Sequence, residues 1–173
     1  EKKMNLKDHI RSIANYPKKG ILFRDITTLI KDEKAFAESI NQIIERSKKY
    51  KIDKIAAIES RGFVFASAVS YLLKKPFIML RKKNKLPAET HSVDFELEYG
   101  TATIEVHKDS IDRGDSILII DDLIATGGTA EAAAKLVEMS GGNVAAFIFA
   151  INLFDLGGSK NLVKKKYNVE NLM

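Results

Sequence analysis

The sequence contains no cysteine, and this absence narrows what the chain can be. Without cysteine there is no disulfide framework and no thiolate metal site, which fits a cytoplasmic protein. Histidine is nearly as scarce: His9, His91 and His107 are the only imidazoles, and their spacing matches no metal-binding motif. We therefore expect no dedicated protein cage for a metal ion.

Long hydrophobic runs are also absent. No stretch of about 18 apolar residues occurs, so we expect no membrane span and no membrane partner. Residues 1–7 lack the apolar core of a secretory signal. Hydrophobic residues still make up 45% of the 173, enough for one buried core, and this length suits one domain. We expect a single domain over residues 1–173.

The charge balance is basic, with a formal net charge of +5. Local clusters occur at residues 81–83 and 164–166, and the second is typical of a solvated surface. A nucleic-acid footprint would require a basic face with aromatic residues interleaved. The nine phenylalanines lie mostly among apolar neighbours, which favours the core. We therefore expect no nucleic-acid partner.

Short apolar runs alternate with segments of helical periodicity along most of the chain. The runs predict strands at 54–58, 77–80, 116–120 and 144–151, and the periodic segments predict helices at 6–14, 33–49, 62–73 and 129–139. Alternation about Gly100 predicts a hairpin, and residues 81–93, which contain Pro87, predict a long loop. The pattern indicates an α/β fold with a mainly parallel central sheet flanked by helices. Ligands of such sheets bind beyond the carboxyl ends of the strands.

The strongest functional signal follows the strand expected at 116–120. Two acids, Asp121 and Asp122, precede a loop of small residues and then a helix. Small residues let backbone N–H groups approach an anion, and a helix N-terminus favours negative charge, so the loop predicts a phosphate site. It has neither the Gly-Lys-Ser/Thr of a Walker loop nor the spacing of a dinucleotide fingerprint. The loop residues are Ala125, Thr126, Gly127, Gly128 and Thr129.

The paired acids have a physical requirement of their own. Adjacent carboxylates repel each other unless hydroxyl groups or a cation compensate, and a ribose diol with a magnesium ion would supply both. The alternative is an ordinary Gly-rich turn between a strand and a helix, which would not need two acids. Residues 117–129 together resemble the motif of the type I phosphoribosyltransferases that binds 5-phosphoribosyl 1-pyrophosphate (PRPP). The resemblance implies that the loop binds the 5′-phosphate of PRPP or AMP, while Asp121 and Asp122 face the ribose. Mg²⁺ would be held mainly by PRPP, with help from these acids.

Residues 20–27 resemble the purine-binding segment of the adenine branch of that family. Phe23 would stack on the base, and the backbone around Leu22 and Arg24 would bind its edge, since backbone offers both a donor and an acceptor. Leu156, near the end of a later strand, would cover the opposite purine face. Taken alone, Phe23 is more typical of a core residue than of a ligand contact.

Residues 59–63 resemble the family's pyrophosphate loop, in which Ser60 and Arg61 would bind the leaving group. Alone, Arg61 could instead form a surface ion pair at a turn. Residues 81–87 and 97–100 resemble the mobile catalytic loop, although Ala88 stands where glycine is common. Arg61 and Lys85 would act catalytically on the pyrophosphate, together with the binding residues Arg81 and Lys82. Glu98 would manage the proton on the purine ring, unless it is merely the polar face of a hairpin.

The resemblance implies a type I phosphoribosyltransferase fold with a small N-terminal hood and a flexible hairpin loop. It implies a homodimer that converts adenine and PRPP into AMP and pyrophosphate in purine salvage, with Mg²⁺. Three alternatives remain open at this point. The chain could use xanthine, guanine or hypoxanthine, it could be a non-catalytic regulator that senses PRPP, or it could be a plain nucleotide-binding module. A regulator would require a DNA-binding unit, and only about fifteen residues precede Tyr16.

Overall fold

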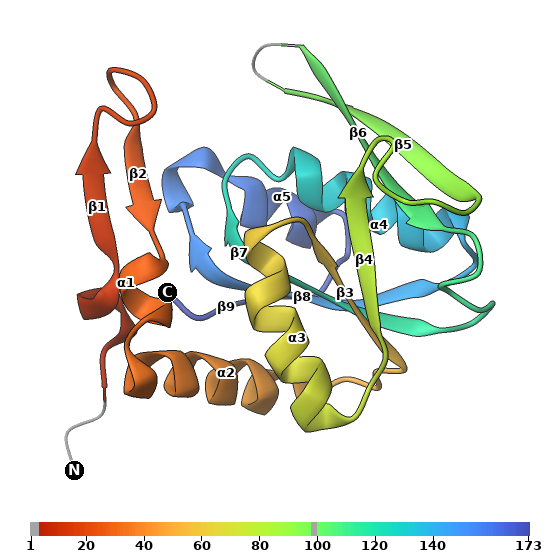
Figure 1. Cartoon of the computed structure of the whole chain (residues 1–173), viewed down its shortest axis with the longest axis horizontal. Coiled ribbons are helices and arrows are strands. Elements are labelled where there is room, and N and C mark those ends of the chain that lie inside the picture. Colours follow the sequence, from red (N-terminus) through yellow and green to blue (C-terminus); the bar gives the residue numbers. More distant parts are fainter. Residues whose placement is uncertain (1–3, 98–99) are drawn as a thin grey trace.

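The computed structural model describes residues 4–97 and 100–173. A seven-stranded sheet lies at its centre, in the order β5-β6-β4-β3-β7-β8-β9 (Figure 1). Parallel pairing joins β4, β3, β7, β8 and β9 in that order. At one edge, β5 and β6 form an antiparallel hairpin, and β6 pairs antiparallel with β4. This arrangement confirms the predicted α/β class. The strands are β3 (Lys54–Ile58), β4 (Phe77–Lys82), β5 (Thr90–Glu96), β6 (Thr101–His107), β7 (Ser116–Ile124), β8 (Asn143–Asn152) and β9 (Val169–Asn171).

Helices cover both faces of this sheet (Figure 1). Along β7, Ile117 and Ile119 pack into the apolar cluster under one pair of helices, and Leu118 and Ile120 into the cluster under the other. Because both faces of the strand are buried, its sequence is a continuous apolar run rather than an alternating one. The first pair is α4 (Gly128–Met139) and α5 (Gly158–Lys164), and the second is α2 (Glu33–Ser47) and α3 (Arg61–Leu73).

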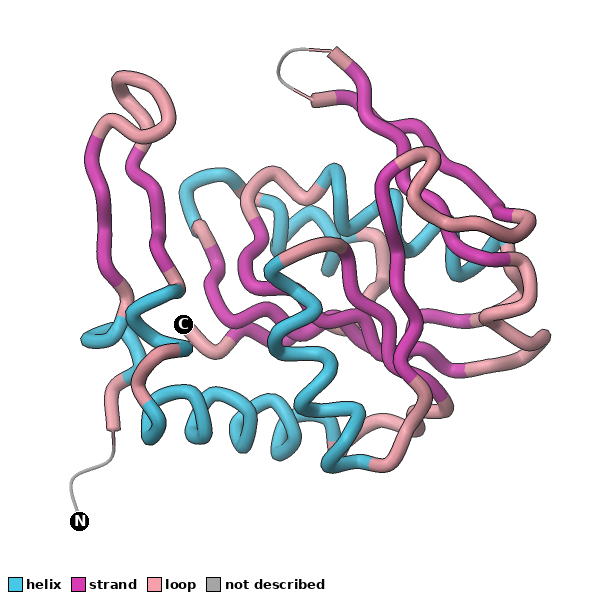
Figure 2. Tube along the Cα trace, viewed as in Figure 1, coloured by secondary structure: helices cyan, strands magenta, loops and turns pink. Residues whose placement is uncertain are grey.

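The N-terminal segment differs from its predicted structure. The helix expected at 6–14 is wrong: a short 3-10 helix, η1 (Leu6–His9), leads into strand β1 (Arg11–Ala14). Strand β1 pairs antiparallel with β2 (Leu22–Asp25), and α1 (Thr27–Ile30) follows. Four apolar positions cannot distinguish a short helix from a strand, so the pairing with β2 decides. The β1–β2 hairpin stands apart from the main sheet as the expected hood (Figure 2).

Three further boundary differences bear on the site. Strand β4 extends to Lys82 and β5 begins at Thr90, so the long loop expected at 81–93 shortens to 83–89. Strand β7 continues to Ile124, which places Asp121 and Asp122 on the strand rather than in the loop after it. These extensions are held by backbone pairing with β6 and β8, which no local pattern reveals. None of the helices within the described residues has the length and apolar character that crossing a bilayer requires.

Asp25 fastens the hood to α1. Its carboxylate accepts hydrogen bonds from the hydroxyl of Thr27 at 2.7 Å, from the backbone N–H of Thr27 at 2.9 Å and from Nε of Arg11 at 2.9 Å. The two Thr27 bonds first, and then Arg11, lower the pKa of Asp25 to about 2. The carboxylate therefore joins both hood strands to the helix that follows them.

This network predicts a pH dependence of stability. The pKa of Asp25 is lower in the folded protein than the value of about 3.9 in an unfolded chain, so its contribution is present above about pH 4. It is lost as the pH falls toward 2. We expect urea unfolding of Asp25→Asn to show a smaller loss of stability between pH 5 and pH 3 than the wild type. Asp109→Asn, at an exposed position, is the matched control and should follow the wild type. An equal pH response in Asp25→Asn would contradict this role.

Candidate functional site

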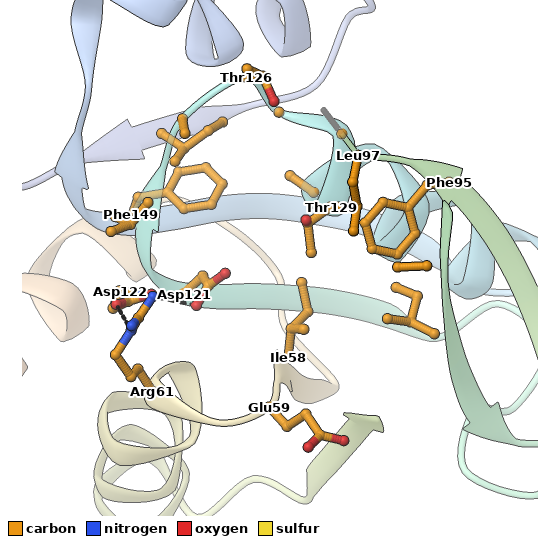
Figure 3. Close-up of a pocket in the computed structure, with 18 of the residues that line it drawn as sticks. Ile58, Glu59, Arg61, Phe95, Leu97, Asp121, Asp122, Thr126, Thr129 and Phe149 are labelled. Carbon is orange, nitrogen blue, oxygen red and sulfur yellow. Dashed lines mark hydrogen bonds and ion pairs between the residues drawn. The ribbon is translucent and has the colours of Figure 1, made fainter. Parts of the chain in front are cut away.

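A pocket of about 480 Å³ opens beyond the carboxyl ends of β3 and β7, where the topology places ligands (Figure 3). It brings together segments far apart in the sequence: the β3–α3 junction, the end of β4, the β5–β6 hairpin, and β7 with the loop after it. Ten of the predicted site residues line it. They are Ser60, Arg61, Lys82, Asp121, Asp122, Ala125, Thr126, Gly127, Gly128 and Thr129.

The small-residue loop forms one end of this pocket, and α4 begins within it. Gly127 has a φ of 92°, a conformation that side chains disfavour, and it immediately precedes the helix. Backbone N–H groups at the start of α4 have no partner within the helix, so an anion at this end can accept from them. The loop therefore has the geometry of a phosphate site.

Gly158, at the start of α5, supports this loop from behind, which the sequence did not reveal. Its N–H donates to the carbonyl oxygen of Ala125 at 3.1 Å. A Cβ atom at Gly158 would lie 2.5 Å from that oxygen and 2.7 Å from the backbone nitrogen of Gly127. Only glycine permits this backbone contact. The pair Gly157-Gly158 signals a turn, but nothing local to it indicates which backbone approaches.

The acidic pair lies beside the β3–α3 junction. Asp122 is only 3% exposed, and Nε of Arg61 approaches its Oδ2 at 2.6 Å (Figure 3). Oδ1 of Asp121 accepts from the backbone N–H of Asp122 at 2.8 Å. Burial first, and then the charge of Asp122, raise the pKa of Asp121 well above its ordinary value. Gly62 allows this arrangement, since a Cβ there would lie 2.8 Å from Oδ1 of Asp121.

The hood contacts Arg61, one of the residues that line the pocket. The guanidinium carbon of Arg61 lies 5.8 Å from the centre of the Phe23 ring, and Tyr16 packs edge-on against that ring at 5.1 Å. Phe23 is half-buried, and neither it nor Leu22 or Arg24 is among the described residues that line the pocket. Leu22 is 50% exposed, and Arg24 donates to the hydroxyl of Ser12 across the hairpin. The hood thus places an aromatic ring beside Arg61, which pairs with Asp122.

The remaining predicted residues lie around the pocket or outside the described chain. Arg81 lies on β4, where its Nε is 3.3 Å from Oε1 of Glu59, and Lys85 follows β4 in a turn. Leu156 lies on η2 (Phe154–Leu156) and is 51% exposed. None of these three is among the described residues that line the pocket. Glu98 lies outside the described residues.

The described residues contain no group of three or more histidines, aspartates or glutamates arranged to hold a metal ion. Among the described residues that line the pocket, Asp121 and Asp122 are the only two adjacent carboxylates, and they directly precede the small-residue loop. Asp121 forms no ion pair with a described residue, while Asp122 is occupied by Arg61. A cation here would depend on oxygen atoms that a ligand brings.

Comparison with known proteins is consistent with this geometry. A model of the phosphoribosyl transferase domain matches residues 26–172. The adenine phosphoribosyltransferase of Pelagibacter ubique is 88% identical, over 98% of this chain and 97% of its own. The crystal structure of the adenine phosphoribosyltransferase from Thermoanaerobacter pseudethanolicus superposes with a TM-score of 0.93 at 48% identity, covering 96% of each chain. The enzyme from Saccharomyces cerevisiae, crystallised with adenine and an imino-altritol bisphosphate, has a TM-score of 0.90 at 35% identity, covering 97% of this chain and 96% of that one.

Proposed function

We infer that this chain, which belongs to the phosphoribosyl transferase domain family and within it to the adenine phosphoribosyltransferases, transfers the 5-phosphoribosyl group of PRPP to adenine. The products are AMP and pyrophosphate. One observation supports the assignment of the site: the paired acids of β7 and the small-residue loop that follows them line the same pocket. The whole chain, residues 1–173, acts as one catalytic domain.

The sugar phosphate is fixed at the β7–α4 end of the pocket. Backbone N–H groups of the loop bind the 5′-phosphate, and the hydroxyls of Thr126 and Thr129 add donors. Asp121 and Asp122 accept hydrogen bonds from the ribose hydroxyls. Binding at the remote phosphate positions the anomeric carbon for the reaction.

The base lies under the hood. Phe23 stacks on adenine, and the backbone near Leu22 and Arg24 distinguishes its edge. Leu156, on the η2 segment that follows β8, covers the other face. The adenine bound to the Saccharomyces cerevisiae relative supports this choice of purine.

The reaction forms a bond from a ring nitrogen of adenine to the anomeric carbon and breaks the bond from that carbon to pyrophosphate. Positive charge develops on the sugar and negative charge on the leaving group, so cations are required on the pyrophosphate side. The positive charges come from four side chains, those of Arg61, Arg81, Lys82 and Lys85. The hydroxyl of Ser60 adds a hydrogen-bond donor. Glu98 takes up the proton that the purine ring releases.

Mg²⁺ fits this donor set. Magnesium in phosphate sites is held by one or two carboxylates together with substrate phosphates, and Asp121 has a carboxylate at the pocket that forms no ion pair with a described residue. Its raised pKa has burial and a neighbouring negative charge as causes, which a nearby cation would offset. When bound, the ion supplies positive charge to the pyrophosphate oxygens.

The test is to incubate the protein with adenine and PRPP, with and without Mg²⁺, and to measure AMP formation by chromatography. We expect AMP and pyrophosphate in equal amounts with the metal, and little turnover after chelation. Hypoxanthine, guanine and xanthine in parallel reactions should give much less nucleotide. Preference for one of these purines would reassign the substrate, and no nucleotide from any purine would reject the enzymatic function.

We also propose that a second copy of the chain covers the outer face of α3. Tyr71 is 82% exposed and Leu72 53%, and the adjoining Val64 and Met79 are 36% and 44% exposed. Val64 and Tyr71 are seven residues apart on one helix face, and Met79 lies on the strand beside it. An exposed apolar strip of this kind is typical of an interface.

We expect sedimentation equilibrium to show a dimer for the wild type and a monomer for Tyr71→Glu. Val163→Glu, at a 54% exposed position on α5, is the matched control and should remain dimeric. A dimer that persists in Tyr71→Glu would place the interface elsewhere.

A further inference from the structure

Glu105, on β6, is a buried carboxylate that the mechanism above does not use. It is 8% exposed and accepts hydrogen bonds from three residues in two segments of the chain, the β4–β5 connection and β5. The backbone N–H of Asn84 donates to Oε1 at 2.8 Å. The hydroxyls of Ser92 and Thr90 donate to Oε2 at 2.6 and 3.1 Å. A buried carboxylate is tolerated because its oxygen atoms are satisfied in this way.

The position of Glu105 in the sheet explains what it holds. Ser92 on β5 and Arg81 on β4 are its register partners on either side, so the three side chains lie on one face. The neighbours of Glu105 on β6, Ile104 and Val106, point to the opposite face and join the core. Glu105 thus faces the chain that connects β4 to β5, rather than the apolar interior.

That connection begins with a tight turn that carries basic side chains. The N–H of Lys85 donates to the carbonyl of Lys82 at 3.3 Å, and Asn84 inside the turn has a φ of 67°. The turn is fastened at two points by carboxylates. Glu59 accepts from the N–H of Lys82 at 2.7 Å, and Glu105 accepts from the N–H of Asn84. Both acids bind the backbone, and neither forms an ion pair with Lys82 or Lys85 among the described residues.

We propose that Glu105 is a positioning residue for the pyrophosphate side of the site: it fixes the Lys82–Lys85 turn and thereby the place of the two ammonium groups. This inference rests on the proposed function. The Ser92 hydroxyl and the Asn84 amide lower the pKa of Glu105, so the group is ionised at neutral pH. By charge alone this carboxylate would repel pyrophosphate. Removal of a repelling charge and loss of a positioning contact therefore have opposite effects on pyrophosphate binding.

The test uses the reverse reaction, in which AMP and pyrophosphate form adenine and PRPP. We expect Glu105→Ala to raise the KM for pyrophosphate about tenfold while the KM for AMP stays within about twofold. Glu105→Gln keeps an acceptor for Asn84 and should restore most of the loss. A lower KM for pyrophosphate in either variant would show that only the charge matters, and an equal rise in both KM values would show general disorder of the hairpin. Either result would overturn the proposal.

Asp94→Asn provides the matched control. Asp94 accepts from the Thr103 hydroxyl across the same two strands, at an exposed position two residues along each strand from the Ser92–Glu105 pair. Its KM values should equal those of the wild type. Amide hydrogen exchange, which needs no turnover, should accelerate at residues 83–89 in Glu105→Ala and not in Asp94→Asn. Unchanged exchange in Glu105→Ala would reject the positioning role even if the protein is active, whereas a wild type that forms no AMP would reject the proposed function as well.

Discussion

Gly158→Val should raise the KM for PRPP at least about a hundredfold, the scale expected when a reacting group is displaced by about 1 Å. A Cβ at this position would lie 2.5 Å from the carbonyl oxygen of Ala125 and 2.7 Å from the nitrogen of Gly127. Both neighbours are backbone atoms, so neither can rotate away, and the phosphate loop itself must move. The loss should appear for every ligand that carries the 5′-phosphate. Steady-state kinetics in both directions should therefore show a raised KM for AMP too.

Pyrophosphate distinguishes this effect from general damage. It lacks the 5′-phosphate, so its KM in Gly158→Val should stay within about threefold of the wild type. Gly157→Asn is the matched control: its φ of 72° is tolerated by asparagine, and a Cβ there would meet no atom within 4 Å. If Gly158→Val leaves the KM for PRPP unchanged while melting normally, the loop does not depend on this contact.

Gly158 also illustrates the limit of prediction from sequence at the site. The phosphate loop could be predicted because its whole apparatus is contiguous: a strand, two acids, small residues and a helix. Its supporting residue comes thirty positions later, and its role exists only because α5 packs against that loop. Asp25 and Glu105 were missed for a related reason. From sequence alone, a carboxylate on a strand is interpreted as solvent-exposed, because its hydrogen-bond donors are known only from the structure.

The same holds for the fold: elements with a clear local signal were predicted, and those that depend on distant contacts were not. The bounds of β3 were predicted correctly because its apolar run ends abruptly at both sides, and the bounds of α2 were close because Asp32 caps it by accepting from the N–H of Ala35. The helix expected at 6–14 was wrong because pairing with β2 outweighs a weak local preference. The start of β5 was hidden for another reason: its residues Thr90 and Ser92 face Glu105, so they show no hydrophobic alternation.

Arg61→Ala should lower kcat/KM for PRPP by a factor of about a thousand, equivalent to ~4 kcal/mol of lost transition-state stabilisation. Two losses combine. The leaving pyrophosphate loses a guanidinium, and Asp122, 3% exposed, loses the cation 2.6 Å from its carboxylate. Arg61→Lys keeps a charge without the planar fork or its contact with Phe23, so it should recover only part of the rate.

The two losses can be separated by a double-mutant cycle with Asp122→Asn, measured on folding stability as well as on rate. Arg61→Ala leaves an uncompensated carboxylate next to Asp121, whose pKa is already raised by burial and by Asp122. Removing the charge of Asp122 should therefore recover stability in the Arg61→Ala background, whereas in the wild type it should cost stability by leaving Arg61 without its partner. The rate should not recover, because the missing cation on pyrophosphate is not restored. Additive effects on stability would show that the pair is not coupled, and recovery of the rate would show that Arg61 serves Asp122 rather than the leaving group.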